Sequence, residues 1–192
     1  MFKNSKFPDT PKLFLLILGC RPNGRNTEQH DTFFGIGKSI NDLLPQIENF
    51  WPDGGKIHID SWRAVTAVNG FEIKVFAKAE APVTSAHKLF FVNLGGYKPA
   101  DMEEYHYKLL SVARDKAEAI SAAKQTAFYL HTGFKGATSH IDDKYGVDVD
   151  DVYEIKEILP MELKDKYVIS ILPSPSLPND KLHIGYLKLN SL

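Results

Sequence analysis

One pattern of residues occurs twice in the chain, and this repeat constrains the fold more than any other feature. In each occurrence an apolar run ends in Leu-Gly and is followed by a polar loop and a Glu-x-His triplet. The first occurrence has Leu18-Gly19, Glu28 and His30, and the second, 76 positions later (94 − 18), has Leu94-Gly95, Glu104 and His106. Self-similarity at a constant separation predicts two copies of one structural unit.

A second block of matching residues supports the repeat. The triplet His58-Ile59-Asp60 returns as His140-Ile141-Asp142, and residues 71–74 return as 153–156, both 82 positions later (140 − 58). One insertion between the two blocks accounts for the longer separation. We therefore predict a lead-in at 1–12, a first unit at 13–76, a linker at 77–88, a second unit at 89–158 and an extension at 159–192.

Each unit is predicted to have the order β-α-β-β. Residues 13–18 are apolar at every position, which is typical of a strand covered on both faces. Thr27 is a suitable helix N-cap, and residues at helical spacing continue to Ile47, with His30 on the apolar stripe. The remaining elements of the unit are a strand at 56–64, an Asn69-Gly70 hairpin turn and a strand at 71–76.

The second unit repeats this plan with a helix at about 102–130 that carries His106 on its inner stripe. A crossover helix would return the second strand parallel to the first, and the hairpin would make the third antiparallel. Strands at 167–172 and 181–189 flank a proline-rich segment and predict a C-terminal β-hairpin. The predicted fold class is α+β, with mixed sheets and one long helix per unit.

Composition and charge argue against several kinds of partner. A formal net charge of −1 over 192 residues gives no attraction to nucleic acid or anionic membrane. No stretch approaches the ~20 apolar residues that a membrane span requires. The single cysteine, Cys20, rules out an internal disulfide and fits a reducing compartment. The Lys-rich start and Gly19-Cys20 imitate a lipoprotein signal, but the apolar run is short and recurs internally, which favours a buried strand.

The repeated acidic and histidine residues are the first candidates for chemistry: Glu28, His30, His58, Asp60, Glu104, His106, His140 and Asp142. Imidazole and carboxylate groups are ligands of zinc, iron and manganese, so a metal site built from both units is one interpretation. Its candidate ligands are His30, His58, Asp60, His106, His140 and Asp142. A structural interpretation competes, because a buried histidine paired with an aspartate fixes packing. A third interpretation is that these residues act in general acid/base catalysis or form hydrogen bonds to a ligand.

Two arginines mark a second candidate site. Arg21 and Arg25 lie between a strand end and the predicted helix start, where a phosphate or carboxylate could bind. A solvated loop is the alternative. Cys20 is expected to be a buried, inert thiol, because a nucleophile needs a base beside it. Residues 35–39 resemble the end of a P-loop, but they lack its first glycine and lie inside the predicted helix, so nucleotide binding is not expected.

Several local motifs together resemble a known family. They are LGCRPNGRNTEQHD at 18–31, FWP at 50–52, HIDSW at 58–62 and NGFEI at 69–73. With these motifs the chain resembles the bacterial uncharacterised family labelled domain of unknown function 1543, in a two-copy form. The resemblance implies a cytosolic bacterial protein and supplies no activity.

Two functions from different classes follow from these observations. The first is a non-enzymatic binding or scaffold protein built from two pseudo-symmetric units. The second is a small enzyme, metal-assisted in one version, with a His/Glu/Asp site between the units. The sequence leaves open the cofactor, the substrate and the protein partner. It also leaves open the oligomeric state, and a homo-oligomer is possible.

Overall fold

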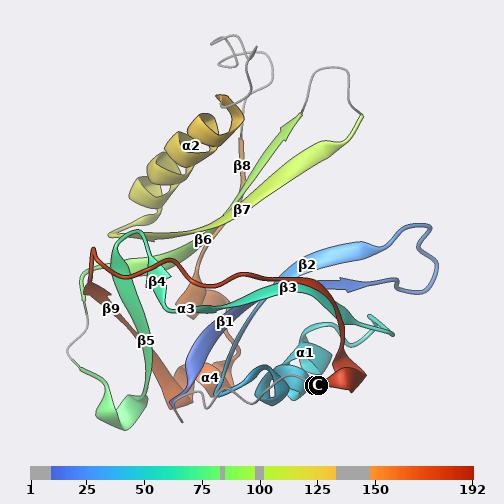
Figure 1. Cartoon of the computed structure of the whole chain (residues 1–192), viewed down its shortest axis with the longest axis horizontal. Coiled ribbons are helices and arrows are strands. Elements are labelled where there is room, and N and C mark those ends of the chain that lie inside the picture. Colours follow the sequence, from blue (N-terminus) through green and yellow to red (C-terminus); the bar gives the residue numbers. More distant parts are fainter. Residues whose placement is uncertain (1–9, 83–84, 98–101, 133–147) are drawn as a thin grey trace. The chain divides into compact units, whose positions relative to one another are not determined.

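The computed structural model describes residues 10–82, 85–97, 102–132 and 148–192 and confirms the α+β class (Figure 1). The chain divides into two compact units. Unit 1 combines Met1–Thr84 with Leu159–Leu192, and unit 2 is Ser85–Ile158. The C-terminal segment therefore belongs to the same unit as the N-terminal half.

Unit 1 contains two antiparallel sheets, which have the strand orders β10-β3-β1-β2 and β4-β5-β9. Its elements are β1 (Lys12–Cys20), β2 (Gln29–Gly37), η1 (Ile40–Leu43), α1 (Leu44–Phe50), β3 (His58–Val65), β4 (Ala67–Val68), β5 (Phe71–Ala77), η2 (Lys78–Glu80), α4 (Met161–Lys166), β9 (Tyr167–Pro173), β10 (His183–Lys188) and η3 (Leu189–Ser191). The strands predicted at 13–18, 56–64 and 71–76 are confirmed.

The long helix predicted from Thr27 to Ile47 is wrong. Its first half is strand β2, which pairs antiparallel with β1 as a hairpin, and short helical turns follow it. The loop between the strands contains Gly24 with a φ of +77°, a value that glycine adopts easily. The apolar residues at helical spacing belong to two kinds of element, although they meet in one core. Phe33 belongs to the strand, whereas Leu43 and Ile47 lie on the short helices.

One apolar core holds the short helices η1 and α1 against the four-stranded sheet of unit 1. Alternate residues of β1, Leu16 and Leu18 among them, are fully buried with Phe33, Leu43 and Ile47. Gln46 of α1 fixes the contact, because its side-chain amide donates to the Ile36 carbonyl oxygen and its oxygen accepts from the Ile36 N–H. On the other face of β1, Leu13 is fully buried, and polar side chains gather beside Gly19 near the end of the strand.

Two further predictions about strand pairing are wrong. The strand at 56–64 was expected to lie parallel to the first strand, but β3 is antiparallel to β1, because strand β2 reverses the chain before η1 and α1 lead into β3. The strands of the C-terminal extension exist, yet they form no hairpin with each other. Strand β9 pairs with β5 and β10 pairs with β3, so the proline-rich segment connects two sheets. The Asn69-Gly70 turn is confirmed, with φ values of +50° and +79°.

Unit 2 is a three-stranded antiparallel sheet with the order β7-β6-β8 and one long helix. Its elements are β6 (Lys88–Tyr97), β7 (Glu104–Ala113), α2 (Lys116–Thr132), β8 (Asp148–Glu154) and α3 (Ile155–Ile158). The helix predicted at 102–130 is therefore half right. A strand occupies its first half, and α2 begins after the N-cap Asp115, which accepts from the Glu118 N–H at 2.9 Å.

The hairpins of the two units have the same register. Lys12 lies opposite Gly37 and Gly19 opposite His30, whereas Lys88 lies opposite Ala113 and Gly95 opposite His106. The pairing with the next strand also shifts register at matching places. The β1–β3 register shifts between Ile17 and Leu18, and the β6–β8 register shifts between Asn93 and Leu94. Among the described residues, no helix is long and apolar enough to span a membrane.

Candidate metal centre

Three neighbouring strands of unit 1 bring two histidines together across one glycine. Gly19 of β1 lies opposite His30 on β2 and opposite His58 on β3. Residues that are paired across a sheet direct their side chains to the same face. The two imidazoles therefore rise on either side of a residue that has no side chain. A Cβ at Gly19 would collide with the imidazole of His58, so the glycine is needed for this approach.

A β-bulge adds a carboxylate to the same place. Leu18 pairs with Ile59 and Ile17 pairs with Ser61, which leaves Asp60 as an extra residue in β3. Bulges change the direction of a side chain and are common beside functional sites. Asp60 contacts both histidines, with Oδ2 at 3.1 Å from His30 Nε2 and Oδ1 at 3.2 Å from His58 Nε2.

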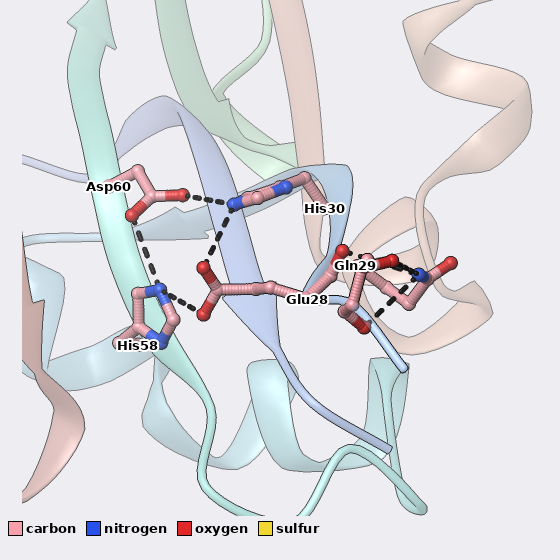
Figure 2. A network of polar contacts seen from close by, with 6 residues as sticks. Glu28, Gln29, His30, His58 and Asp60 are labelled. Carbon is pink, nitrogen blue, oxygen red and sulfur yellow. Dashed lines mark hydrogen bonds and ion pairs between the residues drawn. The ribbon is translucent and has the colours of Figure 1, made fainter. Parts of the chain in front are cut away.

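Glu28 closes the group from the end of the hairpin loop. Its Oε1 lies 3.3 Å from His58 Nε2 and its Oε2 lies 3.6 Å from His30 Nε2 (Figure 2). The four side chains form a ring in which imidazole nitrogens alternate with carboxylates. We call Glu28, His30, His58 and Asp60 the four-residue ring.

The ring has too few protons for its contacts. It contains four N···O contacts, but each Nε2 can carry at most one hydrogen. No more than two of the contacts can therefore be well-aligned hydrogen bonds, and the two carboxylates bring two negative charges. A divalent cation would satisfy both conditions, because it accepts lone pairs from all of these atoms and neutralises the carboxylates.

The spacing of the donor atoms fits a metal ion. Zinc bonds of about 2.0–2.2 Å to nitrogen and oxygen place neighbouring ligands of a tetrahedron about 3.3–3.6 Å apart. The four N···O distances, from 3.1 to 3.6 Å, lie near that range. Glu28, His30 and His58 each offer one possible ligand atom, and these three atoms all lie within 4.8 Å of one another. Asp60 borders both histidines through different oxygens, so it is either a fourth ligand or a partner that orients them.

Exposure differs within the ring. The side chain of His58 is 4% exposed, whereas those of His30, Glu28 and Asp60 are 44%, 47% and 33% exposed. The structural interpretation placed His30 and His106 on the apolar stripes of two helices. Both lie instead on strands, β2 and β7, with side chains that are 44% and 41% exposed. A group that is open on one side leaves room for water or substrate beside a bound ion.

All four members of the ring come from unit 1. On the corresponding strands of unit 2, His106 Nε2 lies 3.2 Å from Asp150 Oδ2, and Asp150 is the bulged residue of β8. Sequence matching assigned His140 and Asp142 to this role, and both lie outside the described residues. By register, Asp148 stands opposite Gly95, where unit 1 has His58.

The two arginines of the predicted anion site have different surroundings. Arg21 donates to the backbone carbonyls of Arg25 and Asn26, so it holds the hairpin loop together. Arg25 lines an open depression of about 420 Å³ on unit 1, together with Pro22, Asn23, Gln29, His30, Asp31, Trp51 and Asp53. This depression adjoins the four-residue ring through His30, which belongs to both.

Cys20 lies beside this region with its side chain fully buried. Burial, with smaller contributions from the negative charges of Asp53 and Glu28, raises the pKa of the thiol. A raised pKa disfavours the thiolate, which is the reactive form. The prediction of an inert thiol agrees with both observations.

Sequence reasoning missed Gly19 as part of the site and missed the strand that carries His30. The pair Ser39 and Asp42 was a usable signal, because Asp42 accepts from the Ser39 N–H at 2.9 Å and marks the start of the short helix η1. Gly35 and Gly37 were a second signal, since glycines are poor helix residues.

Comparisons with known proteins agree with the fold and leave the activity open. The crystal structure of a protein Il1583 from Idiomarina loihiensis is similar to this chain, with a TM-score of 0.62 and 25% sequence identity over 93% of this chain and 97% of that chain. No curated protein matches the sequence. Residues 25–75, which include the whole four-residue ring, match the model of the family described as Domain of Unknown Function (DUF1543).

Proposed function

We propose that unit 1 binds one divalent transition-metal ion through the four-residue ring and that the protein is a metal-assisted enzyme. The observation that carries this proposal is the convergence of two imidazole Nε2 atoms and two carboxylates, 3.1 to 3.6 Å apart, over a glycine. Zinc, iron and manganese are the ions that such a ligand set suits.

Catalytic use is supported by the exposure of the ring. Structural zinc sites are closed by four protein ligands, whereas catalytic sites keep a position for water or substrate. His30 and Glu28 are nearly half exposed, so an ion held between them would meet solvent. An ion in this position would act as a Lewis acid or would lower the pKa of a bound water.

Metal binding can be measured directly. Protein dialysed against chelator and titrated with Zn²⁺ should bind one ion per chain, and His30→Ala should weaken binding at least tenfold because it removes a ligand. Glu28→Gln should also weaken it, since a neutral amide is a poor ligand. The matched control is His106→Ala in unit 2, which should bind Zn²⁺ as the unaltered protein does. Equal binding by His30→Ala and the unaltered protein would refute the proposal.

A non-enzymatic binding or scaffold role is the competing proposal, and it also accommodates Arg25. If the protein is a binder, a small carboxylate or phosphate would bind in the depression that Arg25 lines. The nearby Asp31 and Asp53 carry negative charge and would oppose such a ligand. This arrangement gives the anion proposal weaker support than the metal proposal.

We also infer that the two units descend from a tandem duplication. The equal registers of the β1–β2 and β6–β7 hairpins support this, as do the bulges at Asp60 and Asp150. In this proposal unit 2 retained the glycine, one histidine and the bulged aspartate, while the position of His58 changed to Asp148. The expected outcome is one strong metal site per chain.

A further inference from the structure

The two histidines of the four-residue ring are flanked differently, although both stand beside Gly19. His30 lies on β2, the edge of the sheet, and its side chain is 44% exposed. His58 lies on β3, which has β10 as its other neighbour, and its side chain is only 4% exposed. The ring of Tyr186 from β10 covers the imidazole of His58, with 4.2 Å between ring centroids and 32° between the ring planes.

An irregularity in β10 places Tyr186 there. Ile184 pairs with Ser61 and Leu187 pairs with Ile59, so Gly185 and Tyr186 both lie opposite the single residue Asp60. Gly185 has a φ of +133°, which residues with a side chain rarely adopt. Asp60 is also the extra residue against β1, so the two irregularities fall at the same level of the sheet. Together they direct one carboxylate and one aromatic ring toward His58.

We propose that Tyr186 is a positioning residue of the metal site, which rests on the metal-binding function proposed above. A ligand histidine binds well only when its ring is already held in the orientation that the ion requires. Stacking on Tyr186 keeps the His58 ring from turning, and its Nε2 then stays directed at Glu28 and Asp60. The phenol hydroxyl is not needed for this role, because the contact is made by the two tilted rings.

Tyr186 contributes little to the core, which makes the proposal separable from a general effect on stability. The residue is 64% exposed, and its β10 neighbour Ile184 is 83% exposed. Replacement of an exposed side chain normally has little effect on the free energy of unfolding. A loss of metal affinity in a Tyr186 variant would therefore report on the orientation of His58.

The experiment compares Co²⁺ binding, followed by visible absorption, in the unaltered protein and in Tyr186→Phe, Tyr186→Ala and Ile184→Ala. Tyr186→Phe should bind within about twofold of the unaltered protein, and Tyr186→Ala should bind roughly ten times more weakly, the range found when partners of metal ligands are removed. The absorption spectrum of the Tyr186→Ala complex should also change. Ile184→Ala is the matched control on the same strand and should bind normally.

Each result decides between the proposals. If the unaltered protein binds Co²⁺ and Tyr186→Ala binds it equally with the same spectrum, the positioning role is refuted and the metal site stands. If Ile184→Ala weakens binding as much as Tyr186→Ala, the strand and not the ring is responsible, which also refutes it. If the unaltered protein binds neither Co²⁺ nor Zn²⁺, the metal site itself is refuted. Unfolding temperatures of the metal-free variants should agree with that of the unaltered protein.

Discussion

Replacement of Gly19 by alanine tests the site without removing any ligand. The added Cβ would lie 2.8 Å from His58 Cε1, closer still to its Nε2, and 3.1 Å from Asp60 Oδ2. Ordinary contacts begin at 3.4 Å, so the His58 ring has to move by at least about 0.6 Å (3.4 − 2.8). Metal–ligand distances tolerate only about 0.2 Å of error, so the moved ring can no longer bind an ion in the same place.

The expected result is a loss of metal affinity that exceeds the loss of stability. Overpacking of this kind costs about 1–3 kcal/mol in the free energy of unfolding. Zn²⁺ at a hundred times its dissociation constant should stabilise the unaltered protein by about 2.7 kcal/mol, and this gain should largely disappear in Gly19→Ala. Thermal unfolding with and without Zn²⁺, together with titration calorimetry, measures both quantities.

Unit 2 provides the matched control. Gly95 occupies the same register position, and a Cβ there would collide with the carboxylate of Asp150. Gly95→Ala should therefore destabilise the protein by a similar amount while Zn²⁺ still binds to unit 1. If Gly19→Ala retains the stabilisation by Zn²⁺, or if both variants lose it equally, Gly19 is not required for metal binding in the way argued above.

Two further predictions concern stability. The Asp180 side chain is 1% exposed, and its Oδ1 accepts from the Thr66 N–H, the Thr66 hydroxyl and the Ala67 N–H. Asp180→Ala should therefore lower the free energy of unfolding, measured by urea titration, by about 3 kcal/mol. Asp180→Asn should lower it less, because the amide keeps the Oδ1 acceptor. An equal loss in both variants would mean that the shared Oδ1 contacts do not matter. Burial, with a smaller contribution from Lys181, lowers the pKa of His183, which stacks on Trp62 at 3.8 Å. The folded state then binds fewer protons than the unfolded state, so stability should fall as the pH drops below the ordinary value of 6.5, and His183→Phe should remove this part of the slope between pH 7 and 5.5. A slope that is unchanged in His183→Phe would contradict this assignment.

Strands β1, β3 and β5 could be predicted from local sequence patterns, but the hairpin strand β2 and the pairing that gathers the four-residue ring could not. The apolar run at 13–18, the similar run at 89–94 that only Asn93 interrupts, and the Asn69-Gly70 turn depend on local chemistry, and all of them appear as expected. Residues 27–47 fit a helical period as well as a strand followed by a helix. Pairing with β1 decided in favour of the strand. In the hairpin, the backbone N–H and C=O groups of β2 that face β1 find hydrogen-bond partners there.

The sequence by itself determined which side chains are available for chemistry. It marked Glu28, His30, His58 and Asp60 because imidazole and carboxylate groups recur there, and the α+β class followed from local patterns. Only the tertiary structure decided that these four meet within one unit. Their meeting depends on cross-strand register, on the bulge at Asp60 and on the missing side chain at Gly19, which are relations between strands that no local pattern specifies.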